Sequence, residues 1–153
     1  MAFCRLDKIG ANAHVVSFRH AQELENGMIV ELDKLGADKD SYTAKDVADV
    51  NGKVVLHASV AFDYTETMGS VDFEYRLKPG QLGRGYFLVP GDIITVDEAV
   101  LSASDAIAVG DVFEPKAGRK LTKVDGVRAS KLGLEVVDLE TIMGTKCVVL
   151  QVL

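Results

Sequence analysis

The segment KVVLHASVAF (53–62) alternates apolar and mixed positions with a period of two. Every second side chain is apolar: Val54, Leu56, Ala58, Val60 and Phe62. The intervening positions include three polar residues, Lys53, His57 and Ser59, together with the apolar Val55. Because successive side chains of a β-strand point to opposite faces, this pattern predicts a strand with one buried face.

The same alternation recurs along most of the chain, at 28–33, 72–77, 92–97, 112–113, 134–142 and 146–153. Turn-forming residues separate these segments: Asn26-Gly27, Asn51-Gly52, Pro79-Gly80, Pro90-Gly91, Gly110-Asp111 and Asp125-Gly126. Met143-Gly144-Thr145 joins the last two segments, which predicts a terminal hairpin. Short helices are expected at 43–49, after a possible N-cap at Thr43, and at 98–105.

These patterns predict a mainly β fold, either a compact antiparallel sandwich or a small barrel, with one or two short helices. We expect a single β-rich domain over 26–153 and an N-terminal segment, 1–25, that is an arm or a first strand. Apolar residues on the second face of a strand, such as Val55 and Val149, indicate that a second sheet or a neighbouring subunit covers that face.

The bulk composition excludes several classes of function. The 153 residues are 48% hydrophobic and 26% charged, which is typical of a folded protein. The net charge of −6 disfavours binding to nucleic-acid backbones and to anionic membranes. No apolar run approaches the roughly 20 residues of a membrane span, and the N-terminus does not resemble a signal peptide, so we expect synthesis in a cytoplasm.

The residues that usually carry chemistry are scattered. His14 and His20 flank one predicted strand, where they are expected as polar surface positions, and His57 lies on the polar face of its strand without an evident partner. Cys4 and Cys147 form no zinc or redox motif, and no G-x-S-x-G nucleophile elbow occurs. The sequence therefore predicts no catalytic residue, no metal site and no cofactor.

One segment, RLKPGQLGRGY (76–86), concentrates three basic residues and three glycines in an acidic chain. It lacks the spacing of a phosphate-binding P-loop, and no helix pattern follows it. Flexible glycines would let such a loop fit an acidic partner surface, and arginine is enriched at interface hot spots. Partner contacts by Lys78, Gln81 and Arg84 are one hypothesis for this segment, and a solvated loop is the other.

Four stretches resemble the small accessory head proteins of tailed bacteriophages: NGMIVEL (26–32), VVLHAS (54–59), GRGYFLVPGDIITV (83–96) and GTKCVVLQVL (144–153). The resemblance implies a decoration, or cement, protein that binds the major capsid protein lattice on the capsid exterior. It also implies possible self-association as a trimer, and a location on the virion after synthesis in the host cytoplasm.

Two alternatives stay open at this point. A tail-tube or head–tail connector subunit is also small and β-rich, but it would form rings or tubes on its own. A small-ligand-binding β-barrel belongs to a different functional class. Aromatic residues make up only 7% of the chain and tryptophan is absent, which disfavours a carbohydrate site.

Overall fold

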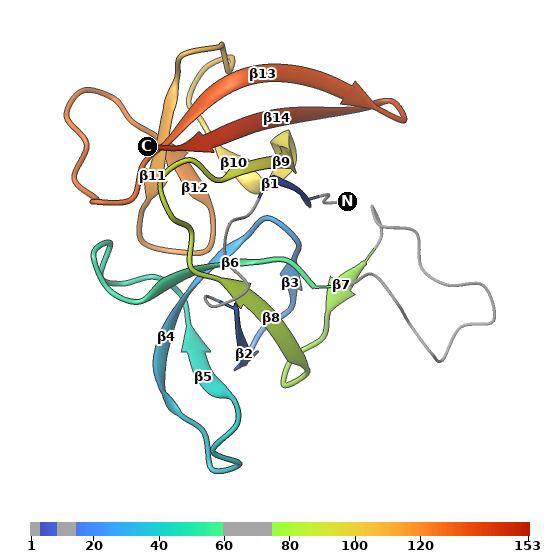
Figure 1. The fold of residues 1–153 in the computed structure, drawn as a ribbon, viewed down its shortest axis with the longest axis vertical. Helices are drawn as coiled ribbons and strands as arrows, with labels where there is room; N and C mark the ends of the chain where they lie inside the picture. Colours follow the sequence, from blue (N-terminus) through green and yellow to red (C-terminus); the bar gives the residue numbers. More distant parts are fainter. Residues whose placement is uncertain (1–3, 9–14, 60–74) are drawn as a thin grey trace.

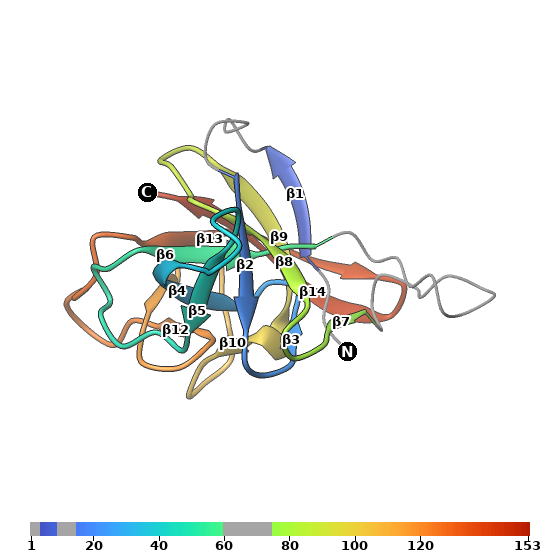
Figure 2. The same cartoon turned by 90° about the horizontal axis from the view of Figure 1, so that it is seen from below.

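The computed structural model describes residues 4–8, 15–59 and 75–153. Two β units pack against each other, a closed five-stranded barrel and a seven-stranded sheet, as seen in Figures 1 and 2. This arrangement confirms the mainly β fold class, with a barrel and a sandwich-like packing of sheets in one chain.

The barrel strands follow the order β2-β5-β4-β6-β8. Their bounds are β2 (Val15–His20), β4 (Ile29–Leu35), β5 (Tyr42–Lys45), β6 (Val54–His57) and β8 (Leu82–Tyr86). β2 and β5 pair in parallel, and every other pair of the barrel is antiparallel. A small ribbon pairs β3 (Leu24–Glu25) with β7 (Arg76–Leu77).

The sheet follows the order β1-β9-β14-β13-β11-β12-β10. Its strands are β1 (Cys4–Lys8), β9 (Ile93–Asp97), β14 (Thr145–Val152), β13 (Leu134–Ile142), β11 (Val112–Pro115), β12 (Leu121–Lys123) and β10 (Leu101–Ser102). β1 lies beside β9 while β2 closes the barrel, so the first 25 residues contribute a strand to each unit.

β6 contacts both cores, and all four of its residues are buried. Val54 and Leu56 pack with sheet residues such as Phe113 and Leu150. Val55, on the other face, packs with Phe18 inside the barrel. The expected cover over Val55 is thus the barrel interior of the same chain.

The terminal hairpin is confirmed, because β13 and β14 pair from Leu134–Val152 to Ile142–Thr145. Met143 and Gly144 both have positive φ, 49° and 82°, as a two-residue type I′ turn requires. The strands expected at 28–33, 92–97 and 112–113 are present as β4, β9 and β11.

The expectation of a helix at 43–49 is wrong. Residues 42–45 form β5, which pairs with both β2 and β4, and Val47 forms an isolated bridge with Gly118. A seven-residue helix is unstable without packing, so these pairings override its local preference.

The helix expected at 98–105 is present only as a single 3₁₀ turn, Glu98–Val100. The Asp97 side chain caps this turn by accepting a hydrogen bond from the Ala99 N–H at 2.8 Å. Of the segment 72–77, only Arg76–Leu77 is a strand within the described residues, and 60–62 and 72–74 lie outside them.

The first prediction concerns Gly85 in β8. A Cβ there would lie 2.7 Å from Cγ2 of Val55 and 3.3 Å from Cδ1 of Phe18, in the barrel core. We expect Gly85→Ala to lower the free energy of unfolding in urea by about 1–3 kcal/mol, the usual cost of overpacking. Leu82→Ala is the control, because Leu82 lies on the same strand and is exposed. Equal stability of the two variants would contradict the tight packing of β8.

Candidate functional site

The segment singled out by its charge forms a tight turn and a barrel strand. Lys78-Pro79-Gly80-Gln81 is a β-turn in which Gly80 has φ +76° and the Gln81 N–H donates to the Lys78 carbonyl at 3.0 Å. The Lys78 N–H in turn donates to Oε1 of Gln81 at 3.0 Å. The Gln81 side chain therefore stabilises the turn itself.

The turn is also anchored to the end of β2. The Gly80 N–H donates to the His20 carbonyl at 2.8 Å, and Nη1 of Arg19 donates to the Gly80 carbonyl at 2.8 Å. The expectation of flexible glycines is wrong for Gly83 and Gly85. Both lie in β8, where the backbone passes close to buried side chains. Lys78 and Arg84 are thus presented by a rigid support.

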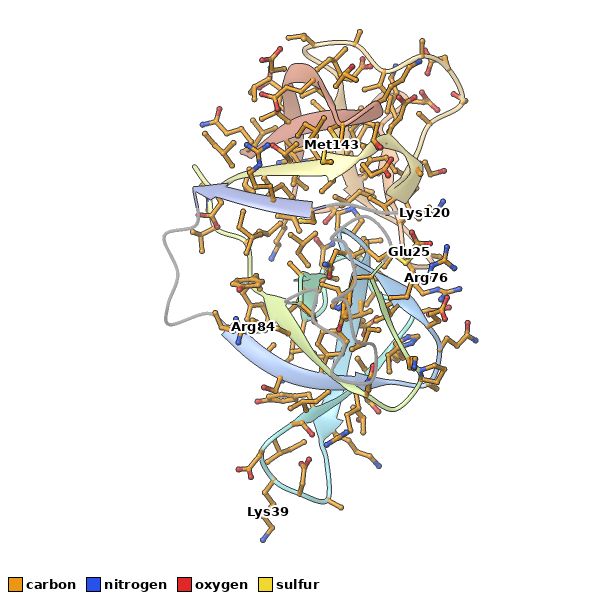
Figure 3. The ribbon with its side chains drawn as sticks, turned by 90° about the vertical axis from the view of Figure 1, so that its right-hand side faces the viewer. Glu25, Lys39, Arg76, Arg84, Lys120 and Met143 are labelled. Atoms are coloured by element: carbon orange, nitrogen blue, oxygen red, sulfur yellow. The ribbon has the colours of Figure 1, made fainter. Side chains whose placement is uncertain are left out.

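Arg84 lies on the outer face of the barrel, on the side away from Glu25 and Arg76 in Figure 3. It borders a hollow of about 200 Å³, which we call the Arg84 hollow. The described residues that line it are Ser17, Ser59, Tyr75, Leu82, Gly83 and Arg84. Leu82 is 52% exposed, so the hollow combines a cation with accessible apolar surface.

Lys78 and Arg84 differ in their ion pairing from Arg76 and Arg19, two other basic residues nearby. Arg76 pairs with Glu23 at 3.1 Å, and this hydrogen bond raises the pKa of Arg76. Arg19 lies 3.9 Å from Asp38. Within the described ranges, neither Lys78 nor Arg84 has an acidic side chain within salt-bridge distance.

A chain of hydrogen bonds lies behind the hollow and includes His57, whose expected position on a polar strand face is wrong. His57 is fully buried. Its Nδ1 lies 3.0 Å from the Glu25 carbonyl and its Nε2 lies 2.9 Å from Oγ of Ser59. Because a carbonyl only accepts, Nδ1 carries the proton and Nε2 accepts from the Ser59 hydroxyl. Oγ of Ser59 also accepts the Arg84 N–H at 3.0 Å.

Asn26 completes this network. Its Nδ2 donates to the Ser59 carbonyl at 3.0 Å, and its Oδ1 accepts the Ser59 N–H at 2.9 Å. The network joins residues 25 to 33 positions apart and fixes the end of β6 against both β3 and β8. Together with the pairing of β8 with β2, it holds the backbone of Arg84 in place.

The hydrogen-bonded pair of Ser59 and His57 has the spacing of a nucleophile and a general base. Its environment suits a structural role better. Burial lowers the pKa of His57 to about 4, so the imidazole is a weak base. The group that orients it is a backbone carbonyl, which cannot stabilise an imidazolium ion as a carboxylate does.

Of the two other histidines, the structure describes His20 and not His14. His20 was expected at the strand surface, which is wrong: its side chain points inward and is 4% exposed. Its Nδ1 accepts the Gln22 N–H at 3.0 Å and its Nε2 lies 3.1 Å from Asp46. His14 lies outside the described residues.

Two carboxylates that the sequence did not single out, Glu31 and Glu114, are buried. Oε2 of Glu31 accepts the Ala48 and Asp49 N–H groups, and these bonds lower the pKa of Glu31 despite its burial. Oε2 of Glu114 likewise accepts the N–H groups of Ala129 and Ser130. No local motif marks either residue, because the loops that they hold are 15 to 18 positions away.

Among residues 4–8, 15–59 and 75–153, no group of three or more His, Cys, Asp or Glu side chains is placed to hold a metal ion. In the same ranges, no helix is long and apolar enough to span a membrane. Cys147 is buried, and burial raises the pKa of its thiol. No known protein-family model, curated protein or solved structure matches this chain.

The second prediction follows from the burial of His57. Its folded-state pKa of about 4 is below the unfolded value of 6.5, so the unfolded chain takes up the proton first as the pH falls. The contribution of His57 to the free energy of unfolding should be fully present above pH 6.5. It should fall by up to about 3 kcal/mol as the pH is lowered to 4.

Urea unfolding at several pH values measures this loss, and NMR titration of the His57 ring in the folded protein measures its pKa directly. His57→Asn is the matched variant, since it removes this pH dependence while other groups still titrate. A His57 ring that titrates near 6.5 in the folded protein would contradict the burial argument.

Proposed function

We propose that the protein is a non-catalytic structural component of a tailed-phage virion. It decorates the capsid exterior and stabilises it by binding the major capsid protein lattice. The observation that carries the proposal is the exposed pair of cations, Lys78 and Arg84, that no described acidic side chain neutralises in a chain of net charge −6.

The geometry around these cations suits a protein interface. The turn that bears Lys78 is fixed by hydrogen bonds to His20 and Arg19, and the Arg84 backbone is fixed by Ser59. A rigid surface loses little conformational entropy on docking, so more of the contact energy remains as affinity. Leu82 adds accessible apolar area beside Arg84, and arginine with adjacent apolar surface is common at interface hot spots.

The assignment to a capsid is supported by the four sequence stretches that resemble phage accessory head proteins. Two of them form β6 and the β8–β9 region, which border the Arg84 hollow and the shared core. A symmetric lattice would multiply modest contacts into strong attachment through avidity. The acidic remainder of the surface keeps such a protein soluble and away from packaged DNA.

The packing of the barrel disfavours a small-ligand function. Phe18, Leu24 and Val55 fill its interior, and a single added carbon at Gly83 would lie 2.6 Å from Leu77. A ligand inside the barrel would need space that these side chains occupy. A tail-tube or connector subunit remains a structural alternative, and self-assembly into rings or tubes without capsids would identify it.

The third prediction tests the proposed capsid contact. The purified protein should co-elute with capsids that lack it, at a fixed stoichiometry, in size-exclusion chromatography with light scattering. Lys78→Glu with Arg84→Glu should weaken this binding by about tenfold or more, because both charges then repel an acidic partner surface. The charge-matched control is Lys116→Glu with Lys131→Glu, two exposed lysines of the sheet unit.

Equal capsid binding by the two double variants would remove Lys78 and Arg84 from the interface. Absence of capsid binding by the unaltered protein would contradict the decoration function itself.

A further inference from the structure

The hairpin of β13 and β14 extends beyond the rest of the sheet and forms an arm, residues 137–146 (Figure 1). β11 pairs with β13 only at Leu134 and Glu135. From Val137 to the turn, no strand of the described part of the chain pairs with β13 on the side opposite β14. Among the described residues, no strand therefore covers this edge of the arm.

The register shows which backbone groups lie along this edge. The two-residue turn makes Ile142 and Thr145 a hydrogen-bonded pair, and hydrogen-bonded and non-hydrogen-bonded pairs alternate from there. The N–H and C=O groups of Thr141 and Leu139 consequently point away from β14. In agreement, the Leu139 N–H donates to Oδ1 of Asp138 at 2.8 Å rather than to β14.

The arm borders a groove of mixed chemistry. Leu139 and Thr141 line this groove of about 280 Å³ with the apolar residues Ala106, Ile107 and Cys147 and the charged residues Glu98, Glu140 and Lys146. Leu139 is 46% exposed and Met143, at the tip, is 84% exposed. Asp138 and Glu140 alternate with Leu139 and Thr141 along the strand, and Glu140 is also one of the residues that line the groove.

We propose that this edge binds an extended segment of a partner protein by strand addition, and that the residues of this segment alternate between basic and apolar. Its backbone hydrogen-bonds to Leu139 and Thr141. Its apolar side chains contact Leu139 and the apolar part of the groove, and its basic side chains reach Asp138 and Glu140. Asp138 exchanges its bond to the Leu139 N–H for an ion pair with the partner.

Charge determines the choice of partner. A second copy of the arm at this edge would place Asp138 and Glu140 near their own counterparts, and like charges across a strand pair are destabilising. A basic and apolar segment complements the carboxylates of Asp138 and Glu140 and the apolar surface at Leu139 and Ile107. This inference is independent of the capsid function, because it involves other strands and the opposite charge.

The experiment uses the full-length protein and a fluorescent octapeptide of alternating lysine and valine, with fluorescence anisotropy as the signal. An octapeptide of alternating lysine and proline is the control, because it keeps the charge and cannot donate every second backbone hydrogen bond. We expect the lysine–valine peptide to bind about tenfold or more tightly than the control. Equal binding of both peptides would show simple charge attraction and would overturn the proposal.

Variants of the arm locate the site. Thr141→Pro removes an N–H that points away from β14, so the hairpin ladder keeps its bonds, and Thr141→Ser is its matched control. We expect Thr141→Pro and Glu140→Lys each to weaken peptide binding by about tenfold, and Thr141→Ser to leave it unchanged.

Hydrogen exchange keeps the proposal testable if Thr141→Pro fails to fold. In the unaltered protein, saturating lysine–valine peptide should slow exchange of the Thr141 and Leu139 amides. Unchanged exchange at both amides, or peptide binding that both folded variants retain, would overturn the proposal.

Discussion

The rest of the structure depends on the burial of β6 on both of its faces. Val55 belongs to the barrel core and Val54 with Leu56 belongs to the core between barrel and sheet. A strand in this position cannot shift register by one residue without exchanging its two sets of contacts. Further bonds tie the units together, including the Val47–Gly118 bridge and the bond from the Ile29 N–H to the Arg119 carbonyl. The two units therefore form one body, which holds the Lys78–Arg84 surface and the arm at fixed positions.

The sequence was most informative where local pattern and tertiary packing agree. The terminal hairpin, β4 and β9 follow from period-two alternation and turn residues alone. It was least informative where residues far away in the chain determine the local structure. Residues 42–45 are a strand because β2 and β4 lie on either side. His57 looks like a surface residue in its own segment, and it is buried because Glu25, 32 positions away, offers a carbonyl to its ring.

The sequence predicted which residues of the candidate site are unusual, but it did not predict the contacts that hold them in place. The concentration of basic residues identified Lys78 and Arg84 as unusual in an acidic chain. Local sequence could not reveal that Gln81 serves the turn, or that Gly83 and Gly85 are required by core packing. The arm illustrates the converse case. Asp138 and Glu140 are ordinary exposed carboxylates in the sequence, and only the strand pairing shows that they flank an open edge.

Native-state hydrogen exchange in a Val55→Ala variant tests most directly whether the protein is one cooperative body. Val55 belongs to the barrel core, whereas Leu150 lies in β14 and belongs to the core of the sheet. If the shared strand couples the units, the substitution should lower the protection of the Val30 and Leu150 amides equally, by about 2 kcal/mol or roughly thirtyfold in rate. A loss of protection at Val30 with Leu150 unchanged would show that barrel and sheet unfold independently, which would contradict the account.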